Sequence, residues 1–111
     1  MAWLLRDGEV LASLEIADSR RARSVGLLGR QGFEGALLIP SCRSIHTIGM
    51  RFAIDVAYCD HDMTVRRVVR MRRFRIGRPA LRPRAVIEAE AGMFARWNLR
   101  PGDQLEIKGG Q

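Results

Sequence analysis

The sequence has only two cysteines and no long apolar run. Cys42 and Cys59 both lie inside apolar segments, and they do not form a Cys-x-x-Cys pair. A disulfide framework or a structural zinc site needs several cysteines or histidines at short spacing, and neither pattern is present. The cysteine content therefore predicts two buried, reduced thiols.

A secretory signal is also lacking. The N-terminal apolar stretch, residues 3–5, is followed directly by Arg6 and Asp7. A secretory signal needs about 7 to 15 apolar residues, and a membrane-spanning helix needs about 20. The sequence accordingly predicts a cytoplasmic protein with no membrane span.

Lysine is nearly absent, and one long region has no acidic residue. All 19 basic residues except Lys108 are arginines, and against 12 acidic residues they give a net charge of +7. Because such an arginine excess can reflect genome composition, the position of the arginines is more informative than their number. Residues 63–87 contain no aspartate or glutamate and nine arginines: Arg66, Arg67, Arg70, Arg72, Arg73, Arg75, Arg78, Arg82 and Arg84. This pattern predicts a local positive field that favours an anionic ligand or an acidic partner.

Length and composition predict one packed domain spanning residues 1–111. A chain of 111 residues with 47% hydrophobic and 28% charged residues has the composition of a globular protein. It is long enough to bury one core and too short for a catalytic domain with a separate partner module.

The chain opens with a hairpin signal. Asp7-Gly8 favours the positive φ angles of a type I′ turn, and residues 3–5 precede it as a short apolar strand. Residues 9–17 then alternate between apolar and polar side chains, as in a half-buried strand, with Leu11 as the exception.

Further strands are predicted from short apolar or alternating runs: residues 36–39, the central stretch from Cys42 to Tyr58 with a bend at Gly49 and a strand at 52–59, then 64–71, 85–90, and a last strand with Leu105 and Ile107. In residues 52–59, Asp55 is expected on the face opposite Val56. In residues 64–71, Arg67 and Val68 fall on the wrong faces, and a β-bulge would reconcile the two halves.

Two short helices complete the expected fold. Residues 20–28 follow possible N-cap residues, and residues 93–99 place Met93, Phe94 and Trp97 on a shared face. The sequence therefore predicts a single α+β, β-rich domain, with a mostly antiparallel, curled or barrel-like sheet and two short helices.

Three blocks of the sequence resemble a known family. They are residues 22–30, with the pattern Gly-Leu-x-Gly-Arg, residues 44–56, with His-Thr-x-Gly-Met-Arg and a following Asp, and Ala91-Gly92 together with residues 99–103. In order and spacing these blocks resemble the microbial family called domain of unknown function 192 (DUF192). The resemblance covers nearly the whole chain and implies a small β-rich domain with two short helices and no assigned activity. Ala53 departs from the family pattern, which usually has proline there, and the exported N-terminus of many relatives is lacking.

Cys42, His46 and Met50 follow one another at spacings of four and carry the soft ligands that suit copper(I). The β-branched residues around them disfavour a helix, and on a strand each step of four residues spans about 13 Å. The three groups then share a face without converging, so no metal site and no cofactor are predicted.

His46 and Asp55 could instead act as a general base and its orienting carboxylate on two strands of a bent hairpin. The alternatives are a structural His46–Asp55 pair, or an Asp55 carboxylate that accepts backbone N–H groups at the Gly49 bend. No nucleophile elbow, P-loop or zinc spacing accompanies these residues. A hydrolase-like enzyme is therefore disfavoured.

A binding module is the preferred interpretation. The ligand-binding residues predicted near the bend are His46, Met50, Arg51 and Asp55, because an arginine beside this pair can grip a carboxylate or phosphate. The predicted anion-binding residues of the arginine tract are Arg66, Arg70, Arg72, Arg73, Arg75 and Arg78. Sequence-independent nucleic-acid binding is the alternative, although Phe74 is nearly the only aromatic residue in the tract and no nucleic-acid-binding motif is present.

Overall fold

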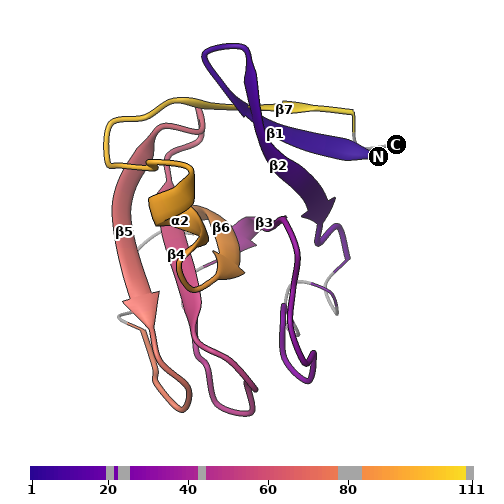
Figure 1. Ribbon diagram of the computed structural model, residues 1–111, viewed down its shortest axis with the longest axis vertical. Coiled ribbons are helices and arrows are strands. Elements are labelled where there is room, and N and C mark those ends of the chain that lie inside the picture. Colours follow the sequence, from indigo (N-terminus) through magenta and orange to yellow (C-terminus); the bar gives the residue numbers. More distant parts are fainter. Residues whose placement is uncertain (20–21, 23–25, 43–44, 78–83, 110–111) are drawn as a thin grey trace.

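The computed structural model describes residues 1–19, 22, 26–42, 45–77 and 84–109. Its strands form one seven-stranded sheet in the order β5-β4-β6-β3-β2-β1-β7 (Figure 1). The strands are β1 (Ala2–Arg6), β2 (Glu9–Ile16), β3 (Ala36–Cys42), β4 (Ile54–Cys59), β5 (Val65–Met71), β6 (Arg84–Glu90) and β7 (Leu105–Lys108). Neighbouring strands are antiparallel except β2 and β3, which run parallel, so the sheet is mixed.

The domain is β-rich as predicted, but it is essentially all-β and not α+β. The described residues contain the helix α2 (Met93–Arg96), which is a single turn. It ends early because Asn98 takes a left-handed conformation with φ 53° and the N–H of Leu99 bonds back to the carbonyl of Phe94. The helix predicted at residues 20–28 falls largely outside the described residues.

The sheet curls until its two edge strands meet at one end. The N–H of Val65 bonds to the carbonyl of Asp103, and the N–H of Gly102 bonds to the carbonyl of Val65, at 2.8 and 2.7 Å. A third bond joins the N–H of Leu105 to the carbonyl of Met63. The result is a half-barrel in which β5 and β7 come together at this end, while the rest of β5 remains an edge of the sheet (Figure 1).

Local irregularities lie where the sequence pattern breaks. Asp7 and Gly8 both have positive φ, 52° and 80°, as the predicted type I′ turn requires. In the β1–β2 hairpin the register shifts so that Leu11 is the extra residue of a bulge. In β5, Tyr58 pairs with Arg67 and Cys59 with Val65, which leaves Arg66 as the extra residue and confirms the predicted bulge.

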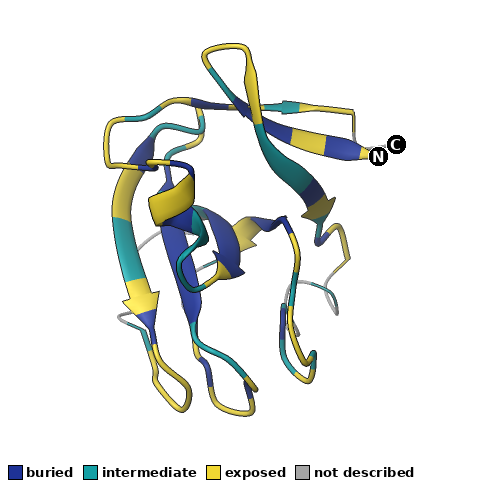
Figure 2. Cartoon of the chain, in the orientation of Figure 1, coloured by how far each residue is buried: buried dark blue, intermediate teal, exposed yellow. Residues whose placement is uncertain are grey.

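Apolar side chains fill both faces of the central strands. Figure 2 shows β4 and β6 almost wholly buried, whereas β5 is buried only at its two ends, Val65 and Met71, and is exposed or half-buried between them. The α2-side core contains Leu4, Leu14, Leu38, Ala57, Cys59, Ile87, Phe94 and Trp97, among others. The loop-side core contains Ala17, Leu27, Leu37, Ile39, Ile45, Met50, Ile54, Val56, Met71 and Val86.

No helix in the described part of the chain is long and apolar enough to cross a membrane.

Candidate functional site

Residues 45–50 run alongside residues 72–77, and this pairing replaces the bent hairpin expected in the central stretch. Between Cys42, the last residue of β3, and Ile54, the first residue of β4, the described residues form no regular strand. They make only an isolated bridge between His46 and Ile76. The N–H of Thr47 bonds to the carbonyl of Arg75 at 2.7 Å, and the N–H of Gly77 bonds to the carbonyl of Ile45 at the same distance. The hydrogen-bonding partner of the His46 segment is therefore the arginine-rich loop that follows β5.

Thr47 also fixes this loop with its side chain. Its hydroxyl donates to the carbonyl of Arg72 at 2.5 Å and accepts the N–H of Arg75 at 2.8 Å. The side chain has no exposed surface, so water does not compete for these bonds. The N–H of Phe74 adds a bond to the carbonyl of Thr47 at 3.0 Å. Thr47 thus holds the backbone that carries Arg72 and Arg75.

A groove of about 570 Å³ lies beside the fixed loop. Its lining contains four arginines and no acidic residue: Tyr58, Arg67, Val69, Arg70, Met71, Arg72, Arg75, Ile76 and Gly77. The guanidinium of Arg67 lies over the ring of Tyr58, 5.6 Å from its centroid. Burial raises the pKa of Tyr58, so its phenol stays neutral at physiological pH. We call this hollow the arginine groove.

Only some of the predicted anion-binding residues lie in the arginine groove. Arg70, Arg72 and Arg75 line the arginine groove, whereas Arg66 forms an ion pair with Asp60 and is not among its lining residues. Arg73 is exposed and lies over the ring of Phe74, 5.5 Å from its centroid. Arg78 lies outside the described residues.

Sequence reasoning missed two residues of this site. Arg67 lines the groove because it shares a face of β5 with Val69 and Met71, as the period of two requires. The bulge at Arg66 places Val65 in the α2-side core instead, and the broken alternation in the sequence was the available signal. Thr47 belongs to the His-Thr-x-Gly-Met-Arg block, but its partners could not be predicted from the sequence because they lie 25 and 28 positions away.

The four residues predicted near the bend do not share one surface. Met50 is buried in the loop-side core, and His46 and Arg51 are exposed. Asp55 is 3% exposed and lies on the opposite face of β4 from Ile54 and Val56, which belong to the loop-side core. A role for these residues in ligand binding stays a prediction.

The Asp55 carboxylate has its own set of partners. Oδ1 accepts a hydrogen bond from Nε–H of Arg70 at 3.0 Å, and Oδ2 accepts hydrogen bonds from the backbone N–H groups of Gly92 and Phe94 at 2.9 and 3.2 Å. Asp55 therefore binds the N-terminal end of α2 and the edge strand β5 together. It accepts backbone N–H groups, as one sequence interpretation had it, but they belong to α2 and not to the Gly49 bend. The structure does not bring His46 and Asp55 together.

The cysteines and the acidic residues offer no metal centre in the described part of the chain. No group of three or more His, Cys, Asp or Glu side chains converges there. Cys59 is buried and Cys42 is half-buried, and no disulfide joins them. Burial raises the pKa of Cys59 to about 12, so this thiol stays protonated.

Comparisons with known proteins give a family and a fold. The family DUF192, described as Uncharacterized ACR, matches residues 2–107. A crystal structure of a "putative transcription regulator" from Sinorhizobium meliloti 1021 has a TM-score of 0.79 and 21% identity, covering 96% of this chain and 91% of that chain. A protein of unknown function from Novosphingobium aromaticivorans DSM 12444 has a TM-score of 0.73 and 21% identity, covering 95% and 82%. The comparison with curated proteins found no match. At this level of identity, the two structures show a shared fold.

Proposed function

This chain belongs to the DUF192 family of uncharacterised proteins, and we propose from its own geometry that it is a binding module for an anionic small molecule or an acidic protein partner. The arginine groove carries the proposal, because it places four arginines around one hollow with no acidic residue in its lining. Guanidinium groups bind carboxylates and phosphates through paired hydrogen bonds, which gives both affinity and orientation.

Three of the groove arginines have no competing carboxylate. Within the described residues, Arg70 forms an ion pair with Asp55, but Arg67, Arg72 and Arg75 form none. The acidic side chains nearest in the β4–β5 hairpin, Asp55 and Asp60, are paired with Arg70 and Arg66. An incoming anion would therefore meet guanidinium groups whose charge is not already neutralised.

The groove is also preorganised. Thr47 fixes the backbone of Arg72 and Arg75, and the ring of Tyr58 supports the guanidinium of Arg67. Groups that are held in place before binding lose less conformational entropy when the ligand arrives. Beside them Phe74 and Ile76 are 62% and 74% exposed, which favours a ligand or partner with an apolar part next to its anionic group. His46, paired with Ile76, is an additional contact that we propose for the rim.

A titration with two simple anions tests the proposal. Sodium tripolyphosphate and a hexaglutamate peptide are titrated by calorimetry into the protein, into Arg72→Gln/Arg75→Gln, and into Arg96→Gln/Arg100→Gln. Both double variants remove two positive charges, and Arg96 and Arg100 are exposed outside the groove. We expect the groove variant to lose at least about tenfold in affinity, and the control about twofold or less, because charge-assisted bonds are local. Equal losses in the two variants would indicate a diffuse field and contradict a groove site.

Nucleic acid is the second candidate, favoured by one observation. The exposed ring of Phe74, with Arg73 beside it, is the kind of platform on which an unpaired base stacks. The description of the Sinorhizobium meliloti protein as a "putative transcription regulator" agrees with this candidate. Binding of a dT12 oligonucleotide should then weaken steeply with salt and with Phe74→Ala, because phosphate neutralisation releases counterions. A flat plot of log affinity against log salt would remove nucleic acid from consideration.

A further inference from the structure

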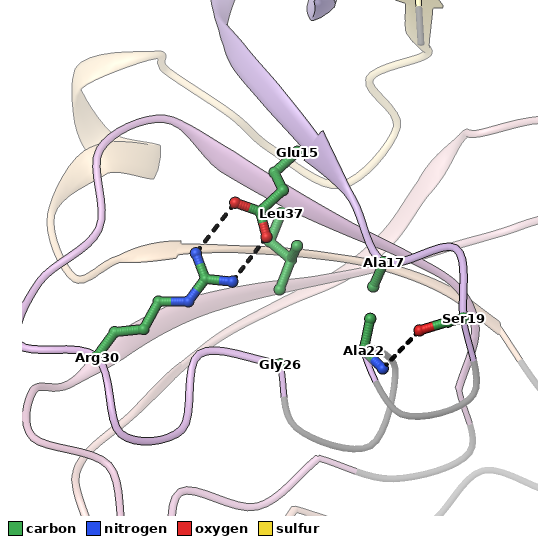
Figure 3. A pocket seen from close by; sticks show the side chains of 7 residues that line it. All are labelled: Glu15, Ala17, Ser19, Ala22, Gly26, Arg30 and Leu37. Atoms are coloured by element: carbon green, nitrogen blue, oxygen red, sulfur yellow. Dashed lines mark hydrogen bonds and ion pairs between the residues drawn. The ribbon is translucent and has the colours of Figure 1, made fainter. Parts of the chain in front are cut away.

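A second hollow, of about 280 Å³, lies between the end of β2, β3 and four residues of the segment that joins them, Ser19, Ala22, Gly26 and Arg30. Figure 3 shows the residues that line it: Glu15, Ala17, Ser19, Ala22, Gly26, Arg30 and Leu37. Gly26 and Arg30 belong to the Gly-Leu-x-Gly-Arg block of the sequence, which the arginine groove leaves without a role. We call this hollow the glutamate pocket, because a buried glutamate lies against one of its walls.

The two charged residues that line the pocket neutralise each other. Arg30 donates two hydrogen bonds to the Glu15 carboxylate, at 3.0 and 2.7 Å (Figure 3). These bonds lower the pKa of Glu15 and raise the pKa of Arg30. The pair is therefore an ionised part of the pocket wall with no net charge.

Glu88 lies behind this wall in the loop-side core. It is 4% exposed on β6, where its register partners are Leu37 of β3 and Val56 of β4. A Cβ atom at Gly26 would lie 3.3 Å from Oε1 of Glu88. Glu88 is not itself a lining residue, but Gly26 is, and because Gly26 has no side chain the carboxyl lies directly behind this part of the wall.

The Glu88 carboxyl lacks a donor within the described part of the chain. No described residue donates a hydrogen bond to it, and burial raises its pKa to about 7, which the charge of Arg30 only partly opposes. The ionisable side chains that act on it are Arg30, from the pocket wall, and Tyr58, from β4, whereas β3 presents Leu37. Among the described residues no fully buried side-chain oxygen lacks a hydrogen-bond partner, so the Glu88 oxygens keep some contact with solvent. Because the carboxyl is largely removed from water and has no donor, a ligand that supplies one is stabilising.

We propose that the glutamate pocket binds a small organic cation, namely a primary ammonium group on a short aliphatic chain. The ammonium donates to Glu88 past Gly26, and the aliphatic part contacts Ala17, Ala22 and Leu37. With Glu88 ionised, the three charged groups sum to a net charge of −1, which one cation neutralises. The volume of about 280 Å³ lies just below the usual range of ligand pockets, which starts at about 300 Å³, so the ligand has few carbon atoms. This site is separate from the proposed anion binding, since its ligand has the opposite charge.

The first experiment is an NMR titration of the ¹⁵N-labelled full chain with n-butylammonium chloride at pH 8, with butan-1-ol as the neutral counterpart. We expect saturable shifts of the amide signals of Gly26, Arg30 and Glu88 with the cation and none with the alcohol. Affinity should fall about tenfold between pH 8 and pH 6, because a group with a pKa near 7 loses about nine-tenths of its charge over this range. The same titration should lower the pKa of Glu88 itself.

Two variants complete the experiment. Glu88→Gln keeps the shape of the side chain and should abolish binding, whereas Glu106→Gln removes the same charge from an exposed position of β7 and should leave it unchanged. The pKa of Glu88 in the unmodified protein gives a readout that does not depend on the folding of a variant. Absence of saturable shifts, equal binding of butan-1-ol, an affinity independent of pH or an unaffected Glu88→Gln would each overturn the proposal. The anion titration of the arginine groove is unaffected by any of these outcomes.

Discussion

The hydroxyl of Thr47 accepts the backbone N–H of Arg75 at 2.8 Å, across 28 positions of the sequence. The same hydroxyl donates to the carbonyl of Arg72. One buried side chain therefore defines the path of the loop that carries the arginine groove. It also explains why the segment around His46 is not a strand, since its hydrogen-bonding groups are directed to this loop.

Replacing Thr47 with valine should loosen this loop. Valine keeps the shape but leaves the N–H of Arg75 and the carbonyl of Arg72 without their partner, which we expect to cost about 1 to 3 kcal/mol in the free energy of unfolding. Tripolyphosphate affinity should fall several-fold, because Arg72 and Arg75 are no longer held. Thr47→Ser retains the hydroxyl, so calorimetry should give it nearly the tripolyphosphate affinity of the unmodified protein. If valine and serine behave alike, the hydroxyl does not organise the groove.

Asp55 should matter more for stability than its ion pair with Arg70. Asp55→Ala leaves the N–H groups of Gly92 and Phe94 and the guanidinium of Arg70 without an acceptor. We expect a loss of about 3 kcal/mol in urea unfolding. Arg70→Gln removes a partner whose side chain is 58% exposed, so its cost should stay below about 1 kcal/mol. Equal costs for the two variants would mean that Asp55 acts through the ion pair alone.

Stability should depend on pH through Glu88. In the unfolded chain this carboxyl ionises at its ordinary value of about 4.5, and in the folded chain at about 7. Between these values unfolding releases a proton, so the folded state loses stability as the pH rises through this range. Glu88→Gln removes the effect, and its advantage over the unmodified protein should grow from near zero at pH 4.5 to about 3 kcal/mol at pH 8. Urea unfolding at several pH values measures this difference, and a constant difference would contradict a raised pKa.

Gly35 should tolerate no side chain. It lies directly before β3 with φ 88°, and a Cβ there would come within 2.7 Å of the Ser13 carbonyl oxygen. Gly35→Ala therefore combines backbone strain with a clash against the neighbouring strand, and should cost more than about 2 kcal/mol. Gly8 has a similar φ of 80° but no atom within 4 Å of the added Cβ, so Gly8→Ala should cost only about 1 kcal/mol. Thermal unfolding of the two variants separates the clash from the strain.

Features that depend on a few neighbouring residues were predictable from the sequence. Asp7-Gly8 indicated the type I′ turn, and the broken alternation at Arg67 indicated a bulge, because turn and strand conformations are determined within a few positions. The placement of Val56 and Asp55 on opposite faces of β4 was also predictable, because successive side chains of a strand point to opposite faces. The three motif blocks indicated the family, which the match over residues 2–107 confirms.

The predicted α+β class was wrong, because the helix expected at residues 93–99 is reduced to a single turn, and the end of a short helix depends on local capping. A positive φ at Asn98 stops α2 after one turn, and the expectation of seven helical residues at 93–99 did not take it into account. A helix this short contributes little stability by itself. It is held by Asp55, which lies 37 positions from Gly92 in the sequence.

The sequence by itself determined the strands, the hairpin, the family and the basic character of residues 63–87. Only the tertiary structure decided which side chains act together: Thr47 with Arg72 and Arg75, Asp55 with α2, and Glu88 behind Gly26. The reason is that strand periodicity and turn conformation depend on adjacent residues, whereas these contacts join positions that become neighbours only when the sheet curls. Glu88 was visible in the sequence as a charged residue within a largely apolar strand, but its burial behind a pocket wall was not.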